Sequence, residues 1–309
     1  MNILEQEHYL GLIYKCKNSR EIDAFYSYKN LILPNKIYRY QACTKENLDA
    51  LKNNYIWLSN ADKFNDLHDC KVNIDSDLWV VNNVFRDYNL SQLETKKVLK
   101  LISIAKDNLE FETFLNTILS IEYTKINEIL NPLKDIDTYK EYYKRFTEYN
   151  NPHKDKQAQV KCGITCFSSK NDSILMWAHY ADWNKGYCIE YDISEVPKFK
   201  HFLYPIMYLS EPIFKPELVD MNATITQTIF ATSKFKDWYY ENEYRYINKI
   251  NGKFMMDKPP SCLYLGSCIE KEEEKKLLHI AKIKKIPQVR KIVTIAGKYE
   301  LSSEIIYEQ

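Results

Sequence analysis

One segment in the middle of the chain constrains its fold more than any other. Residues 164–167 read as a short β-strand that ends in a polar, serine-rich turn. Ser173 can cap the apolar residues 174–181, which are long enough for about two helical turns. After Gly186, residues 187–191 return as a second strand. The expected unit is therefore a strand, a turn, a helix and a strand.

The overall composition is typical of a globular protein. Of the 309 residues, 45% are hydrophobic and 28% are charged, and this length allows one large domain or two smaller ones. The net charge of +1 argues against a global electrostatic footprint for nucleic acid. The chain has only 6 glycines and neither the Walker nor the Rossmann glycine pattern, so a glycine-rich phosphate loop is not expected.

Cysteine usage and the absence of long apolar runs indicate the compartment. The 8 cysteines lie mostly within apolar stretches, and no Cys-x-x-Cys pair occurs among them. Charged residues interrupt the apolar residues near the N-terminus, which is unlike a signal peptide. No apolar run is long enough to span a bilayer. We therefore expect a cytoplasmic protein with reduced thiols and no membrane partner.

Apolar periodicity and turn residues predict the remaining elements. Strands are expected at 37–40, 55–58, 202–209, 238–247, 263–265 and 291–296, and helices within 4–30 and at 45–53, 220–234 and 270–284. Residues 90–150 read as three helices that form an inserted lid or satellite bundle. We expect a single α+β domain over residues 1–309, with a mixed or antiparallel core sheet and an inserted helical subdomain at 90–150.

The pair Glu241 and Glu243 is a candidate for acid–base chemistry. In a strand, residues two apart share a face, so both carboxylates would point into the same space. Two close like charges shift each other's titration, which separates a general base from an electrostatic stabiliser. The alternative is a solvated strand face on which Arg245 completes a ladder of charges.

Arg39 and the two serines after the first strand of the central unit are candidate ligand-binding residues. Burying Arg39 inside an aromatic strand is costly unless its guanidinium meets a carboxylate or a phosphate. The alternative is an edge-strand arginine paired with a nearby acid. Ser168 and Ser169 can orient a ligand or a carboxylate at a strand end, and the alternative is that they cap the next turn.

His179 and an acidic turn are weaker candidates. His179 lies in an apolar helix, where a hydrogen-bonded histidine is the simpler interpretation and a general base the alternative. Asp62, Asp66, His68 and Asp69 could together hold a metal ion, but a solvated turn is the interpretation we favour.

Four motifs of the chain resemble a bacterial family that is catalogued only as a domain of unknown function. They are Y-R-Y at Tyr38–Tyr40, W-L-S…F-N-D at Trp57–Asp66, C-F-S…N-D…M-W-x-H-Y-A…G-x-C-I-E-Y at Cys166–Tyr191, and W-x-Y-E-x-E-Y-R at Trp238–Arg245. Proteins of this kind invite the hypothesis of a toxin or a phage-defence effector. The resemblance itself names no activity.

The order of a strand arginine, strand-end serines and Glu-x-Glu also resembles a second family. It is similar to the Arg…Ser-Thr-Ser…Glu-x-Glu pattern of mono-ADP-ribosyltransferases of the cholera- and pertussis-toxin kind. The middle motif here is Phe-Ser-Ser rather than Ser-Thr-Ser, and the spacings are longer. The resemblance implies an ADP-ribosyltransferase-like sheet and NAD as the bound nucleotide.

This second resemblance also implies roles for particular residues. Glu243 would stabilise an oxocarbenium-like transition state, Glu241 would help to deprotonate the acceptor, and Ser168 would brace the nicotinamide–ribose region. The residues expected to contact NAD are Arg39, Tyr40, Ser169, Trp238 and His179. The partners implied are an ADP-ribose acceptor of unknown identity, either protein or nucleic acid, and an inhibitor protein.

Two other classes of function stay open at this point. One is a metal-dependent hydrolase or nuclease that uses Asp66, Asp69, His179 and Glu243. The other is a sensor or interaction protein without catalytic activity, whose tyrosine-rich surface binds a partner.

Overall fold

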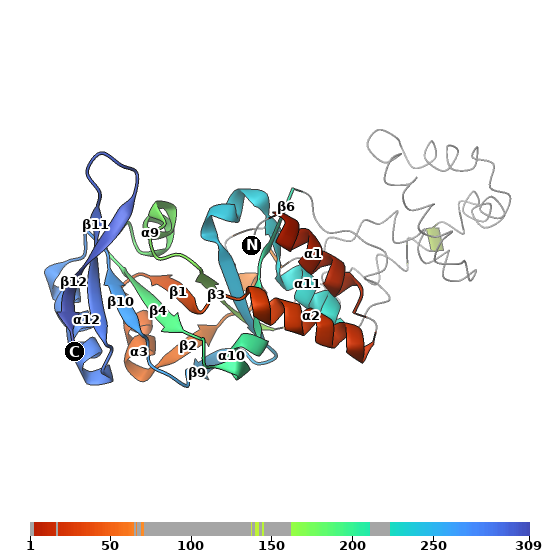
Figure 1. Ribbon diagram of the computed structural model, residues 1–309, viewed down its shortest axis with the longest axis horizontal. Coiled ribbons are helices and arrows are strands. Elements are labelled where there is room, and N and C mark those ends of the chain that lie inside the picture. Colours follow the sequence, from red (N-terminus) through yellow and green to blue (C-terminus); the bar gives the residue numbers. More distant parts are fainter. Residues whose placement is uncertain are drawn as a thin grey trace. The chain divides into compact units, whose positions relative to one another are not determined.

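The computed structural model describes residues 3–16, 18–64, 66, 69–70, 137, 140–141, 144, 162–210 and 223–309 (Figure 1). The chain divides into two compact units, one formed by Met1–Lys71, Val160–Pro212 and Asn222–Gln309, the other by Val72–Gln159 and Ile213–Met221. Every helix and strand named below belongs to the first unit. The helical insertion expected at 90–150 lies outside the described residues, apart from the few single positions above, and stays a prediction.

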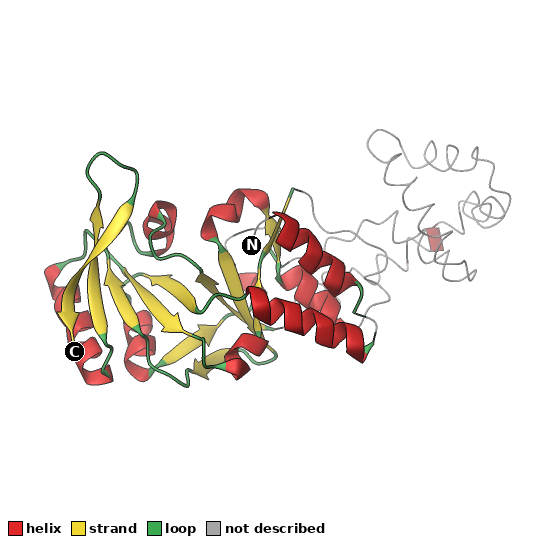
Figure 2. Cartoon of the chain, viewed as in Figure 1, coloured by secondary structure: helices red, strands yellow, loops and turns green. Residues whose placement is uncertain are grey.

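An eight-stranded mixed sheet forms the first unit's framework (Figure 2). In spatial order its strands are β12 (Leu301–Glu308), β11 (Gln288–Thr294), β10 (Cys262–Leu265), β4 (Tyr187–Asp192), β1 (Lys36–Gln41), β3 (Gly163–Ser168), β8 (Glu243–Asn248) and β5 (Leu203–Pro205). Neighbouring strands are antiparallel except β10 and β11, which are parallel. The expected α+β class with a mixed sheet is thereby confirmed.

Two small sheets and a set of helices complete this unit. The small sheets pair β2 (Tyr55–Leu58) with β9 (Gly252–Met255) and β6 (Met207–Leu209) with β7 (Ser233–Phe235). The α-helices are α1 (Ile3–Tyr14), α2 (Ser19–Ile32), α3 (Lys45–Asn53), α9 (Ile174–Tyr180), α10 (Pro197–His201), α11 (Ala223–Ala231) and α12 (Lys271–Lys284), and the 3-10 helices are η1 (Ala61–Lys63) and η4 (Lys236–Glu241). None of the helices in the described part of the chain combines the length and the apolar character needed to cross a membrane.

Side chains of the central strands alternate between two faces of the large sheet. We call one the core face, and it carries Ile37, Phe167, Ile189, Tyr246 and Leu263. We call the other the cavity face, and it carries Tyr38, Tyr40, Cys166, Ser168, Glu190, Glu243 and Arg245. The core face packs against apolar residues of α12, and α9 covers part of the cavity face through Met176 and Trp177.

The helix ends follow from local side-chain chemistry. Ser173 accepts a hydrogen bond from the backbone N–H of Met176 (3.4 Å), and Thr44 accepts one from that of Asn47 (3.3 Å). Both bonds satisfy an N–H group that has no partner within its helix. Both caps are those expected from the sequence, and they set the starts of α9 and α3.

Three expected elements are wrong in part. The helix expected at 220–234 ends at Ala231, since residues 233–235 form β7 instead. The strand expected at 202–209 is two short strands, β5 and β6, that belong to different sheets. The strand expected at 238–247 begins only at Glu243, because η4 occupies the residues before it. The strands β9 and β12 were not expected.

Gly186 lies where three segments of backbone meet. A Cβ atom at this position would be 2.2 Å from the carbonyl oxygen of Gln41 and 3.0 Å from that of Ala181. Both neighbours are backbone atoms, which cannot move aside as a flexible side chain does. A residue without a side chain is therefore required between α9 and β4.

Lys29 of α2 is fully buried, and no carboxylate of the described residues pairs with it. Its ammonium donates to the backbone carbonyls of Lys200 (2.6 Å) and Leu203 (2.9 Å), and it lies over the rings of Tyr26 and Tyr204. Burial lowers the pKa of Lys29 from 10.5 to about 7. This lysine therefore links α2 to the end of α10. Its effect on the stability of the fold depends on whether the amine is protonated, because burial disfavours the charged form.

Replacement of Gly186 by alanine should destabilise the protein. We expect the free energy of unfolding to fall by about 1–3 kcal/mol, because the added methyl group overpacks against backbone. The matched control is Gly11→Ala in α1, where a Cβ would meet nothing within 4 Å. That change should raise stability by about 0.5–1 kcal/mol. Urea unfolding of both variants measures the difference, and equal midpoints would contradict the tight approach at Gly186.

Lys29 should give the stability a characteristic pH dependence. Between pH 7 and 10.5 the unfolded chain holds a proton on Lys29 that the folded protein has released. The contribution of Lys29 to the free energy of unfolding should therefore rise with pH across this window, by at most about 1.4 kcal/mol per pH unit. Buried thiols such as Cys70 and Cys166, whose pKa values are raised, contribute with the opposite sign near the upper end of the window. The difference in free energy of unfolding between the wild type and Lys29→Met should show this rise, because the other groups titrate alike in both proteins. Urea unfolding at several pH values compares the two proteins, and identical pH profiles would show that Lys29 titrates normally.

Candidate functional site

A cavity of about 370 Å³ opens on the cavity face of the large sheet. Its charged lining residues are Lys63, Asp69, Lys234, Glu241, Glu243 and Arg245, and its aromatic and sulfur-containing ones include Tyr38, Tyr40, Phe64, Cys166, Met176 and Tyr180. These residues come from segments that are far apart in the chain. Five of the six charged side chains are buried, and Lys63 is the exposed one.

Arg245 is the centre of the buried charges. It lies on β8 with none of its side chain exposed. Two of its nitrogens bind the two carboxylate oxygens of Asp69, at 2.7 and 2.6 Å, in a bidentate pair. Its Nε donates to Glu243 at 2.7 Å, and another N–H donates to the carbonyl of Ala231 at 2.9 Å. The guanidinium also lies 5.0 Å from the ring centre of Phe64. Its fork of donors is thus fully used.

Lys234 joins the two glutamates. Its ammonium donates to Glu241 and, at 2.9 Å, to Glu243. It lies 4.9 Å from the ring centre of Trp238 and 3.8 Å from a carboxylate oxygen of Asp69. Burial acts to lower the pKa of Lys234, but the attraction of Glu243 and Glu241 outweighs it and raises that pKa above its usual value. The lysine is therefore charged, and three carboxylates share two cations.

The two glutamates meet although they do not lie on one strand. Glu241 is the last residue of η4, and Asn242 then adopts the left-handed conformation (φ 46°) before β8 starts at Glu243. Asparagine is one of the few residues that tolerate this conformation. The reversal directs both carboxylates to Lys234. The shared space expected for the pair exists, but the turn at Asn242 creates it, and strand alternation does not.

The surroundings push the pKa values of the two carboxylates in opposite directions. Burial raises the pKa of Glu241, and the nearby charge of Glu243 raises it further. Burial also acts to raise the pKa of Glu243, but Arg245 and Lys234 outweigh it and hold that pKa well below its usual range. Tyr180 donates a hydrogen bond to Glu241 at 2.5 Å. Glu243 is therefore firmly ionised, and Glu241 is the carboxylate that takes up a proton more readily.

Two thiols complete the network. Cys166, opposite Arg245 in the pairing of β3 with β8, donates a hydrogen bond to Glu243. Cys70 donates to Asp69 at 3.4 Å. Burial raises the pKa of both thiols, so they remain protonated donors.

Ser168 and Ser169 serve the turn after β3. The buried hydroxyl of Ser168 donates to the backbone carbonyl of Glu241 at 2.7 Å and accepts from the N–H of Lys170 at 3.1 Å. The backbone N–H of Ser169 donates to the carbonyl of Asn242. Ser168 lines the cavity and fixes the backbone of Glu241, whereas Ser169 does not line the cavity and fixes the backbone of Asn242.

Three expected contacts of the nucleotide lie in or near the cavity. Tyr40 lines it, and its hydroxyl donates to the carbonyl of Lys170 at 2.8 Å. Trp238 packs over Lys234. His179 is exposed on α9, and its Nδ1 lies 3.0 Å from the hydroxyl of Tyr240, a hydrogen bond whose direction depends on the imidazole tautomer. The fold therefore brings all three near the glutamates, with Tyr40 the most deeply placed.

The structure does not bring Arg39 to this cavity. On β1, Tyr38 and Tyr40 point to the cavity face, so Arg39 between them points to the core face. It pairs in register with Ile189, and the pKa of Arg39 is lowered by burial. An arginine in the middle of a strand cannot share a face with both of its tyrosine neighbours.

Four residues of the site were not singled out from the sequence as a set. Lys234 was expected in a helix, and Arg245 was considered only as part of a solvated ladder. Asp69 was considered only as part of a metal site. Glu190 is buried on the cavity face, where it accepts hydrogen bonds from Tyr264 (2.8 Å) and from Tyr38, which it orients beside the cavity. Of these four residues, only Glu190 and Arg245 lie within the motifs shared with the uncharacterised family. Membership of a motif is therefore the one sequence signal that could have identified them, and it applies to neither Lys234 nor Asp69.

The residues considered for a metal site contact other side chains instead of converging on one point. Asp69 and Glu243 both bind Arg245, and His179 binds Tyr240 instead. Asp66 is described, whereas His68 lies outside the described residues. Within the parts of the chain that the structure describes, no group of three or more histidine, cysteine, aspartate or glutamate side chains is placed to hold a metal ion.

Comparison with known proteins gives one family. Residues 176–246 match a family described as "Protein of unknown function (DUF2971)". The matched range contains Lys234, Glu241, Glu243 and most of β8, whereas Asp69 lies outside it. The match is consistent with the expected resemblance to an uncharacterised family. No curated protein and no solved structure matches the chain.

Removal of Arg245 should be strongly destabilising. Arg245→Met leaves the carboxylates of Asp69 and Glu243 buried with less compensation, so the free energy of unfolding should fall by about 3–5 kcal/mol. The control is Arg20→Met at an exposed position of α2, which should change stability by less than about 0.5 kcal/mol. Urea unfolding of the two variants and the wild type measures these changes in the free energy of unfolding. A loss at Arg245 no larger than that at Arg20 would show that the network is not a structural requirement.

Proposed function

We propose that this cavity cleaves an N-glycosidic bond, with NAD as the glycosyl donor, and transfers ADP-ribose to a nucleophile. The observation that carries the proposal is the pair of glutamates. Glu241 and Glu243 contact the same lysine inside one cavity, and their pKa values are pushed apart. Two carboxyl groups with separated pKa values are the arrangement that glycosyl transfer uses.

Glu243 suits the role of the fixed negative charge. As the bond between nicotinamide and ribose breaks, its electron pair leaves with the nicotinamide and positive charge grows on the ribose. A carboxylate that is already ionised and held by Arg245 and Lys234 needs no reorganisation to stabilise that charge. Its contacts keep Glu243 ionised throughout the ordinary pH range.

Glu241 suits the role of the general base. The new bond forms between the ribose C1′ and an oxygen, nitrogen or sulfur atom of the acceptor, and the proton of that atom passes to Glu241. A raised pKa brings a carboxylate closer to the value at which a base works best near neutral pH. When the acceptor is water, the same step yields free ADP-ribose and one proton.

The walls of the cavity fit the remaining parts of such a donor. Tyr38, Tyr40 and Tyr180 offer aromatic surface to a flat nicotinamide ring, and the faces of such rings also attract its positive charge. Lys63 also lines the cavity with 73% of its side chain exposed, so we assign the phosphate contact to Lys63 instead of Arg39. The cavity volume lies within the usual range of about 300–1,000 Å³ for small-molecule sites.

The order of the strands supports the resemblance to ADP-ribosyltransferases. The strand with Tyr38 and Tyr40, the strand that ends at Ser168 and the strand that begins at Glu243 are consecutive neighbours, as β1, β3 and β8. We propose on this basis that the sheet is ADP-ribosyltransferase-like. The acceptor, protein or nucleic acid, and an inhibitor protein belong to the same proposal.

Release of nicotinamide from NAD by the purified protein tests the proposal. Glu243→Gln should lower kcat by at least about 100-fold, since a preorganised charge is lost. Glu241→Gln should lower transfer by about 100-fold and remove the acid limb of the pH profile of kcat/KM. The matched control is Glu304→Gln on the exposed edge strand, which should leave the rate unchanged.

Two further measurements keep the result interpretable. Near-ultraviolet circular dichroism establishes that each variant is folded, and calorimetry measures the binding of NAD to it. Stimulation by a cell lysate would indicate transfer to an acceptor and not hydrolysis alone. Neither binding nor turnover of NAD by the folded wild-type protein, with or without lysate, would overturn the proposal.

A further inference from the structure

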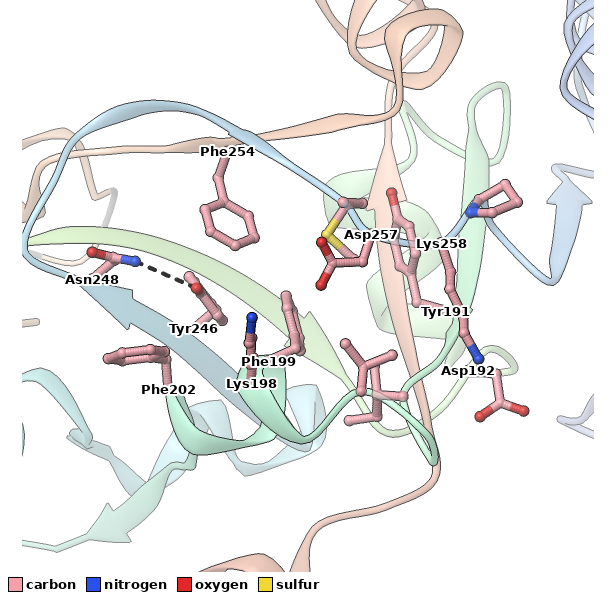
Figure 3. Close-up of a pocket in the computed structure, with 14 residues that line it drawn as sticks. Tyr191, Asp192, Lys198, Phe199, Phe202, Tyr246, Asn248, Phe254, Asp257 and Lys258 are labelled. Carbon is pink, nitrogen blue, oxygen red and sulfur yellow. Dashed lines mark hydrogen bonds between the residues drawn. The ribbon is translucent and has the colours of Figure 1, made fainter.

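A second cavity, of about 230 Å³, lies at the core face of the large sheet (Figure 3). Its lining comes from the ends of β4 and β8, from α10, and from the segment that runs from β9 to Pro259. Tyr246, which lines it, is the neighbour of Arg245 on β8 and points to the opposite face. The cavity is therefore separate from the one that contains the glutamates.

Aromatic rings form the inner wall of this second cavity. Phe199 stacks on Tyr246 with ring centres 4.5 Å apart, and Phe254 lies 4.9 Å from the same ring. Phe202 lies 5.9 Å from Tyr246 and is 39% exposed. The hydroxyl of Tyr246 accepts a hydrogen bond from Asn248, as Figure 3 shows. Such a wall favours a flat apolar ring over a polar ligand.

The rim of the cavity carries two charges of opposite sign that have no partner in the described part of the chain. Neither Lys198 nor Asp257 makes an ion pair or a hydrogen bond with another described residue. Both residues line the cavity together with Phe199, and Figure 3 labels all three. By contrast, Lys258 binds Glu195 at 2.8 Å, and Asp192 accepts hydrogen bonds from the backbone and side chain of Ser194. Among the described lining residues, Lys198 and Asp257 are thus a cation and an anion left available to a ligand.

We infer that this second cavity binds a free aromatic amino acid. The ring would pack against Phe199, Phe202 and Phe254, the ammonium group of the ligand would pair with Asp257, and its carboxylate with Lys198. A zwitterion matches both free charges at once. A nucleotide matches less well, because Asp192, Glu195 and Asp257 outnumber Lys198 and Lys258 and would repel phosphate.

Calorimetry with tryptophan, tyrosine and phenylalanine tests the inference, because each carries a ring and both charges. Given its size, tryptophan should bind with a Kd of about 0.5 mM. Lys198→Gln should weaken tryptophan binding about 3-fold and leave tryptamine, which lacks the carboxylate, unaffected. Asp257→Asn should do the same to tryptophan and leave indole-3-propionate, which lacks the ammonium, unaffected.

Two more variants separate the ring from the charges. Phe202→Ala, at a partly exposed position, should weaken binding of tryptophan, tryptamine and indole-3-propionate together. Lys200→Gln is the matched control on the same short helix, since Lys200 does not line the cavity, and it should bind tryptophan like the wild type.

Three results would overturn the inference. The first is the absence of binding of all three amino acids at millimolar concentration. The second is tryptophan binding that is unchanged in both Lys198→Gln and Asp257→Asn. The third is preferential binding of adenosine monophosphate that depends on Lys198. None of these results depends on NAD turnover, so the inference about the second cavity and the proposed function are tested separately.

Discussion

The buried guanidinium of Arg245 is the contact on which the site depends. It joins Asp69, Glu243 and the end of α11, which are far apart in the chain. Burying charge costs several kcal/mol per ion unless each charge is compensated. Here every oxygen of Asp69 and Glu243 meets a cation or a thiol. The same contacts that compensate the buried charges also orient Glu243 and keep it ionised, so the packing and the protonation state of Glu243 depend on one network.

The two faces of the large sheet separate two kinds of environment. The cavity face collects carboxylates, cations and tyrosine hydroxyls, whereas the core face collects rings and aliphatic side chains. Strand alternation enforces this division residue by residue, as Arg245 and Tyr246 on β8 illustrate. A charged cavity and a cavity walled by aromatic rings can therefore be built from neighbouring residues without sharing a side chain.

Local patterns predicted much of the fold, because they report on interactions between residues close in the chain. Ser173 and Thr44 were recognisable as caps, and the short strands around the serine turn were recognisable from apolar runs between polar residues. The failures lie where a distant partner decides the conformation. Residues 233–235 form β7 only because β6 lies beside them, and the edge strand β12 forms because β11 offers it a partner. The wrong assignment at Trp238 has the same cause, since η4 brings Glu241 onto Lys234.

The sequence by itself determined the class of the fold, the helix caps and the identity of Glu241 and Glu243 as a pair, since these depend on residue type and short spacing. Only the tertiary structure decided their partners. It placed Lys234, Asp69 and Arg245 around the glutamates, and it turned Arg39 to the other face of β1. The physical reason is that the stability of a buried charge depends on what surrounds it in space. That arrangement arises only when strands distant in sequence pair in register.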